Sequence, residues 1–360
     1  DGQGPVPLFY EPLDGNATGF EATLQNMDHL KQHVQVDRLL RISDKGCFRA
    51  KIVAETQRQG FDLIASLKWI MPYPALLEQA WAAGQTFTPL PSLGQNQARK
   101  ADPTDREGYA GLEVAHPLTY GGRTYPLRIL FIRSDGKVQR AQKTRAKHCA
   151  KLEAAIQALQ AKVGRSHGRN PEKLQAQIEA VRQRAPEGRF LQVSLKVHGG
   201  KAVRLQYTWD EAGLQAAARW DGLYALATTL PAEAYPMARV FQLFKEQHYV
   251  ESANRQLKGP LRVRPMFLQT QAHIESLVFI LVLALMGYML VERWYRQRVS
   301  EPAGRKTTTR TLLAAFQPYA LTVVVTAAGV QKFPNALTPR QRAILAVLQV
   351  DPQEIWKAAG

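Results

Sequence analysis

The sequence predicts an α/β fold, because its first part alternates strands with helices. Strand-like runs at 5–13, 37–43 and 61–69 are separated by helical patterns at 20–34 and 49–59. Such alternation is typical of βαβ units, in which a sheet carries helices on its faces. A length of 360 residues suits two or three domains, and a hydrophobic share of 45% with 21% charged residues excludes a wholly disordered chain.

Asp44 comes directly after the strand-like run at 37–43. Right-handed crossovers bring the carboxyl ends of parallel strands to one edge of a sheet, and open α/β sheets bind ligands at that edge. We therefore expect Asp44 to lie at a binding edge.

Basic residues outnumber acidic ones, 47 Lys and Arg against 30 Asp and Glu, which gives a net charge of +17. This excess predicts a polyanionic partner, with nucleic acid ahead of a membrane surface. Residues 133–189 hold 14 basic and 5 acidic residues, so +9 of the excess lies in that stretch. A phosphate-facing surface and an ordinary solvated helical hairpin both fit this concentration of basic residues.

Two cysteines, Cys47 and Cys149, exclude a disulfide framework and a CxxC zinc site.

The middle of the chain has a different pattern. Two segments, 116–132 and 191–207, alternate apolar and polar residues around a Gly-Gly pair, which predicts two β-hairpins. Two helical patterns, at about 138–163 and 171–184, lie between them. We expect a mixed unit of β-hairpins and a basic helical hairpin here.

The last third is expected to be helical. Residues 234–258 predict one long polar helix, and 299–360 predict a tail with two short helices, one capped at Thr338-Pro339 and one at Asp351-Pro352. The sixteen uncharged residues at 276–291 fall between the length of a typical buried run and the roughly 20 residues of a membrane span. We expect a buried core helix there, with a membrane span as the weaker alternative.

Five residues of the expected long helix could form a site that binds a metal ion and a phosphate. Phe244, Glu251 and Lys258 are spaced by seven, which places them on one helical face, and Gln247 and Arg255 lie about 40° from that line. A carboxylate beside an ammonium can hold a metal ion while the ammonium binds a phosphate. A solvated amphipathic face is the more common meaning of this spacing alone.

The spacing Phe244-x2-Gln247-x3-Glu251-x6-Lys258 resembles the Y-x2-R-x3-E-x6-K signature of DDE transposases from bacterial insertion sequences. The segment YVESANRQLKGPLRVRPMFLQTQAHIESLVFILVLALMGYMLVER is similar to the run that follows the catalytic glutamate in that family. The region of the family's second catalytic aspartate resembles RISDKGCF together with FDLIASL. A family segment that precedes the glutamate helix resembles RWDGLYALATT, and an early strand segment of the family resembles DGQGPVPLFYEPLDGN. The resemblance covers nearly the whole chain, in consistent order.

This resemblance implies an RNase H-like core with a β-rich insertion. It implies that the strand with the first catalytic aspartate is missing, so that the chain is N-terminally truncated and inactive by itself. The implied units are 1–70 (first part of the core), 71–215 (insertion), 216–298 (second part of the core, with the buried apolar helix) and 299–360 (helical tail).

The resemblance also implies the site. Asp44 and Glu251 would be two of three carboxylates that hold two Mg²⁺ or Mn²⁺ ions, a choice that suits hard oxygen ligands. Asp221 is a weaker candidate near the metals. The implied DNA-binding residues are Lys258, Gln247, Arg255, Arg262 and Arg264. Phe244 and Gln247 depart from the family's tyrosine and arginine.

The implied function is metal-dependent strand cleavage at transposon ends, followed by strand transfer to target DNA. Double-stranded DNA would be the partner, a homodimer would form in the DNA complex, and the protein would be cytoplasmic, at the nucleoid, without a membrane contact. The missing strand and the two departures leave open an alternative, a catalytically inactive, truncated DNA-binding remnant.

Overall fold

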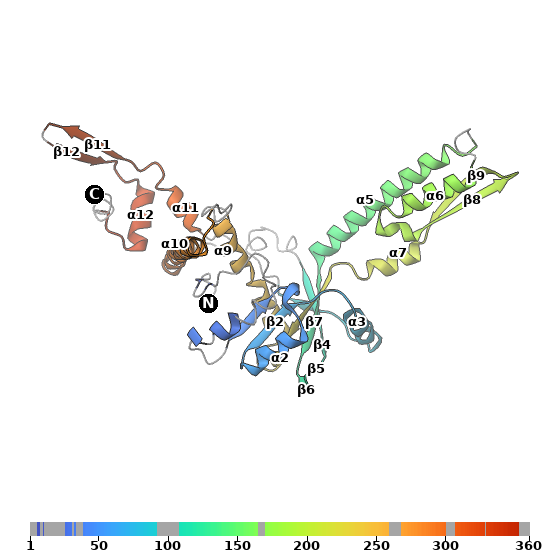
Figure 1. Ribbon diagram of the computed structural model, residues 1–360, viewed down its shortest axis with the longest axis horizontal. Helices are drawn as coiled ribbons and strands as arrows, with labels where there is room; N and C mark the ends of the chain where they lie inside the picture. Colours follow the sequence, from blue (N-terminus) through green and yellow to red (C-terminus); the bar gives the residue numbers. More distant parts are fainter. Residues whose placement is uncertain are drawn as a thin grey trace.

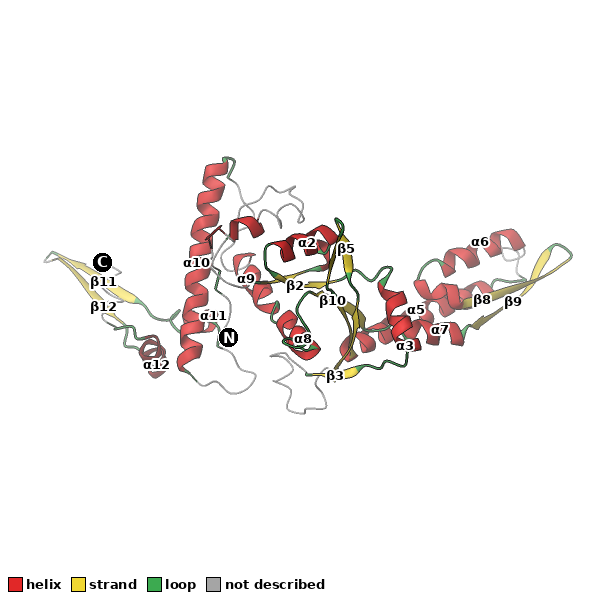
Figure 2. Ribbon diagram, turned by 90° about the horizontal axis from the view of Figure 1, so that it is seen from below, coloured by secondary structure: helices red, strands yellow, loops and turns green. Residues whose placement is uncertain are grey.

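A computed structural model describes the chain over most of its length. The described residues are 6–7, 10, 26–30, 32–33, 39–91, 108–164, 170–258, 268–299, 307–327 and 329–352. They confirm the α/β class. Figures 1 and 2 show a central sheet with an arm of helices and strands on one side and the C-terminal elements on the other. The strand expected at 5–13, part of the helix expected at 20–34 and the helix expected after 352 lie outside the described residues.

The central sheet is mixed and has the order β1-β2-β10-β7-β4-β3. Its strands are β1 (Leu40–Ser43), β2 (Asp62–Ser66), β3 (Thr88–Leu90), β4 (Tyr109–Ala115), β7 (Arg128–Ser134) and β10 (Leu223–Thr228). β1 and β2 are parallel, whereas β2 and β7 are both antiparallel to β10. The carboxyl ends of β1, β2 and β7 therefore meet at one edge, and Asp44 follows β1 there as expected.

Both faces of this sheet are covered, which explains the near-continuous apolar runs of its central strands β2, β7 and β10. Phe131 of β7 points to the face packed by α2 (Ala50–Arg58) and α3 (Tyr73–Ala82). Its neighbours Leu130 and Ile132 point to the other face, where they pack on Val240 and Phe241 of α8 (Met237–Lys245). Successive residues of a strand face opposite sides, so one apolar run fills two cores.

The range 71–215, expected as one insertion, divides in the structure. β3, β4 and β7 belong to the central sheet, and β5 (Leu118–Tyr120) with β6 (Arg123–Tyr125) forms a separate short hairpin. The remainder is an arm with its own apolar core. The arm comprises α5 (Asp135–Gln160), α6 (Pro171–Arg182), η4 (Pro186–Phe190), β8 (Leu191–His198), β9 (Lys201–Trp209) and α7 (Glu211–Ala218). The helical pair and the β8–β9 hairpin are confirmed, and both glycines of its turn, Gly199 and Gly200, have positive φ.

The single helix expected at 234–258 is wrong. α8 ends at Lys245, and α9 (His248–Lys258) begins three residues later. At the break, the backbone N–H groups of Glu246 and Gln247 donate to Leu243 and Phe244 in tight i to i−3 bonds. Phe244 therefore lies on a different helix from Glu251 and Lys258.

The apolar helix α10 (Gln271–Arg298) is not the buried core helix that we expected. Leu285 and Met289 are its buried residues, whereas Ile280 is 61% exposed and Phe279 is 48% exposed. Its inner side packs on α11 (Thr309–Ala314), where the Thr309 hydroxyl donates to the Tyr288 carbonyl. Within the described residues α10 is the one helix long and apolar enough to cross a membrane, a test that core helices of soluble proteins also pass.

The C-terminal tail is not wholly helical. After α11 the chain forms a hairpin of β11 (Leu321–Thr326) and β12 (Gly329–Pro334), and then α12 (Pro339–Leu348). The β-branched run of β11 and the glycine that opens β12 are local signals of a β-hairpin, although a helical tail was predicted. The start of α12 was expected, and a capping box between Thr338 and Gln341 stabilises it.

Candidate functional site

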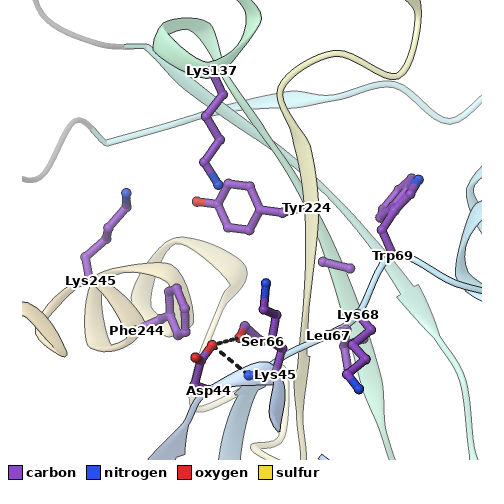
Figure 3. Close-up of a pocket in the computed structure, with 11 residues that line it drawn as sticks. Asp44, Lys45, Ser66, Leu67, Lys68, Trp69, Lys137, Tyr224, Phe244 and Lys245 are labelled. Carbon is purple, nitrogen blue, oxygen red and sulfur yellow. Dashed lines mark hydrogen bonds between the residues drawn. The ribbon is translucent and has the colours of Figure 1, made fainter. Parts of the chain in front are cut away.

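A cavity of about 650 Å³ opens at the edge of the sheet where β1, β2 and β7 end (Figure 3). It is formed by the residues after β1 and β2, the first turn of α5, the start of β10 and the last turn of α8. Its lining residues are Asp44, Lys45, Ser66, Leu67, Lys68, Trp69, Lys137, Tyr224, Ala225, Phe244 and Lys245. The lining contains four lysines and a single carboxylate, so the cavity is electropositive and suits an anionic ligand.

Asp44 is held in place by the turn that follows β1. It is the N-cap of the 3-10 helix η1 (Lys45–Cys47), and its Oδ1 atom accepts a 2.7 Å bond from the Lys45 backbone N–H and a 2.9 Å bond from the Ser66 hydroxyl. These two bonds, with the Lys45 charge, outweigh the opposing effect of burial and lower the pKa of Asp44. The group is therefore a fixed, ionised carboxylate at neutral pH.

Ser66→Ala should raise the pKa of Asp44 toward its ordinary value, because the variant removes a donor that favours the charged form. A depressed carboxyl pKa stabilises the fold above the unfolded-state value, and that stabilisation is lost as the pH falls through the folded-state value. The variant should therefore lose less stability than wild type on acidification. NMR titration of the carboxyl resonance, assigned by its absence in Asp44→Asn, measures the pKa; an unchanged value would contradict the role of Ser66.

Two of the cavity lysines are positioned by aromatic rings. Lys137, in the first turn of α5, places its Nζ atom 3.8 Å from the centre of the Tyr224 ring. Figure 3 shows it approaching that ring from the side opposite Asp44. Lys245, at the end of α8, places its Nζ atom 4.2 Å from the centre of the Tyr109 ring and also donates to the Tyr109 hydroxyl over 3.0 Å. Ring contacts of this kind hold an ammonium group while leaving its charge available to an anion.

Glu251 does not line this cavity. It lies in the first turn of α9, and its side chain is exposed. Arg255 and Lys258 are exposed on the same helix at i+4 and i+7, so these three residues share one face as expected, and Gln247 is half-buried in the turn before it. Arg262 and Arg264 lie outside the described residues.

Asp221 has a structural partner. Its carboxylate forms a two-pronged ion pair with the Arg145 guanidinium, at 2.6 and 2.8 Å, and its side chain is 9% exposed. The pair fixes α5 to the turn that precedes β10. Asp221 is not among the residues that line the Asp44 cavity.

The side chains of the Asp44 cavity provide only part of the ligand set for the two metal ions that the family resemblance implied. Asp44 offers carboxylate oxygens of the kind that Mg²⁺ prefers. It is the one carboxylate of the cavity lining, and within the described part of the chain no group of three His, Cys, Asp or Glu side chains could hold a metal ion. A two-ion site would need further carboxylates at this edge.

The four lysines of the cavity were not predicted from the sequence. Lys45 and Lys68 follow the ends of two adjacent parallel strands, and that position was a readable signal. Lys137 and Lys245 come from α5 and α8, and no local pattern connects them to Asp44. Phe244, noted as a departure from the family signature, lines the cavity.

No family model, no curated protein and no solved structure matches this chain.

Proposed function

We propose that this protein is a DDE-type DNA transposase built on an RNase H-like core. The observation that supports this best is Asp44, an ionised carboxylate just after the carboxyl end of β1, on the wall of a cavity that four lysines also line. Phosphodiester chemistry needs cations around the phosphate and a hard oxygen ligand close to it. The ordered family resemblance along the chain and the net charge of +17 support the same proposal.

The cavity residues have separate tasks in this proposal. Lys45, Lys68 and Lys245 neutralise the scissile phosphate and its neighbours, which lowers the repulsion that an incoming oxygen nucleophile meets. Asp44 and Glu251 are the proposed ligands of Mg²⁺ or Mn²⁺, and such ions supply an activated nucleophile and neutralise the leaving oxygen. Because Glu251 is exposed on α9, the proposal requires α9 to approach the cavity when DNA binds.

The reaction would be hydrolysis of a phosphodiester at the element's ends, followed by attack of the freed 3′-hydroxyl on target DNA. Lys258, Gln247, Arg255, Arg262 and Arg264 are the proposed contacts to the DNA backbone. The partners would be double-stranded DNA and a second copy of the protein in the DNA complex, and the location the cytoplasm, at the nucleoid.

The test uses the protein as its gene encodes it, with duplex DNA that carries the ends of the element. We expect strand nicking in the presence of Mg²⁺ and none in excess EDTA, read on a denaturing gel. Binding of the same DNA in EDTA, measured by fluorescence anisotropy, is the control for a folded protein. Binding without nicking at any Mg²⁺ or Mn²⁺ concentration would overturn the enzymatic proposal.

A non-catalytic DNA-binding protein is the second candidate. The exposed position of Glu251, away from the cavity that contains Asp44, favours it. In that case the four lysines would bind a backbone phosphate without cleaving its ester. Binding without nicking in the test above is the result expected of this candidate.

A further inference from the structure

We propose that one face of α5 is the track along which a nucleic-acid backbone reaches the Asp44 cavity. This inference rests on the proposed function and adds the surface that binds the substrate. Five exposed basic residues form what we call the α5 stripe: Lys137, Arg140, Lys143, Lys147 and Lys151.

The geometry of the helix places these side chains together. At 100° per residue they fall within a sector about 120° wide, and their rise along the axis is about 21 Å. That length matches about six base-pair steps of duplex DNA at 3.4 Å each. The two carboxylates of α5, Asp135 and Glu153, lie outside the sector, so acidic groups do not interrupt it.

The opposite face of α5 is occupied by the arm itself. Leu152, Ile156 and Leu159 are buried in the core of the arm. Arg145 pairs with Asp221, and His148 contacts Glu187, on the inward side as well. The α5 stripe is therefore the solvent-facing side of a helix that is anchored along its length.

One end of the stripe reaches the cavity. Lys137 belongs to both, because it lines the cavity beside Tyr224 and begins the line of cations on α5. Figure 1 shows α5 extending outward from the sheet along the arm. A continuous row of positive charge that ends beside an ionised carboxylate suits a long polyanion with regularly spaced phosphates, and duplex DNA has that form.

Two cations of the β8–β9 hairpin, Lys196 and Arg204, do not extend the α5 stripe. Lys196 and Arg204 lie directly opposite each other on β8 and β9, a repulsive arrangement, and both are exposed. They do not line the cavity. These two residues could contact a further phosphate of the DNA, but such a contact would lie outside the α5 stripe.

The test replaces Arg140, Lys143, Lys147 and Lys151 by glutamine in the full-length protein. Lys137 is left intact, because it belongs to the cavity. The matched control makes the same change of four charges on other exposed surfaces, at Lys173 and Arg184 near α6 and at Arg340 and Arg342 of α12. Glutamine keeps helix propensity near that of lysine and arginine, and circular dichroism checks that both proteins fold.

The readout is the affinity for duplex DNA, without metal, between 50 and 300 mM salt. Each phosphate contact adds about −0.9 to the slope of log K against log salt concentration. The four replaced cations of the stripe variant should therefore reduce the steepness of that slope by up to about 3.6, and the control should reduce it by less than 1. Equal slopes for the two variants would overturn the track. So would a stripe variant that binds DNA normally and loses affinity for vesicles containing anionic lipid. This experiment measures DNA binding and not cleavage. The α5 stripe can therefore be confirmed as the DNA-binding surface of a protein that does not nick DNA, and it can be refuted in a protein that does.

Discussion

Replacing Asp44 by asparagine should lower Mg²⁺-dependent nicking at least about 100-fold, because loss of a metal ligand costs no less than the 10–100-fold typical of residues that support one. Asparagine can still cap η1 and accept from Ser66, so the fold should be retained. Affinity for DNA should stay constant or rise, since the variant removes the one negative charge of a cavity with four lysines. Single-turnover nicking and anisotropy measure the two effects separately.

The control for this prediction is Asp210→Asn. Asp210 also caps a helix with its carboxylate, through a 2.9 Å bond from the Gly213 N–H, but it lies in the arm. It should nick DNA at close to the wild-type rate. Glu251→Gln tests the second proposed ligand in the same assay, with loss of nicking and unchanged binding expected. Normal nicking by Asp44→Asn would remove the basis of the proposed site.

Replacing Arg128 by alanine should lower the free energy of unfolding by about 2–4 kcal/mol, somewhat less than the roughly 3–5 kcal/mol of a fully buried ion pair, because the Glu113 side chain is 26% exposed. Its guanidinium makes a two-pronged contact with Glu113 of β4 at 2.6 and 2.7 Å. It also donates to the carbonyls of Leu230 and Tyr235, in the segment that leads from β10 to α8. The variant leaves a carboxylate and two carbonyls without this donor. Denaturation by urea measures the change.

Arg58→Ala is the matched control. Arg58 also pairs with a carboxylate, that of Glu55, but its side chain is 64% exposed, whereas that of Arg128 is 12% exposed. Exposed pairs contribute little to stability, because solvent screens the two charges. Replacing Arg128 and Glu113 together by methionine should restore part of the lost stability, because no charge is then left unpaired. Equal losses in the free energy of unfolding for Arg128→Ala and Arg58→Ala would show that the bonds made by Arg128 do not stabilise the fold more than an exposed ion pair does.

The sequence alone determined what depends on neighbouring residues. The pattern of 49–59 predicted α2, the Gly-Gly turn predicted the β8–β9 hairpin, Thr338 predicted the start of α12, and the end of a strand-like run placed Asp44 at the edge of the sheet. Periodicity, turn residues and caps act over a few residues, so they can be recognised without the rest of the chain.

Only the tertiary structure decided which distant segments meet. It placed β3, β4 and β7 in the central sheet, ended α8 at Lys245, and left much of α10 exposed. It also brought Lys137 and Lys245, from α5 and α8, to the cavity of Asp44. Strand pairing and side-chain convergence depend on contacts between residues far apart in the chain, and an apolar run has the same pattern whether or not another segment covers it.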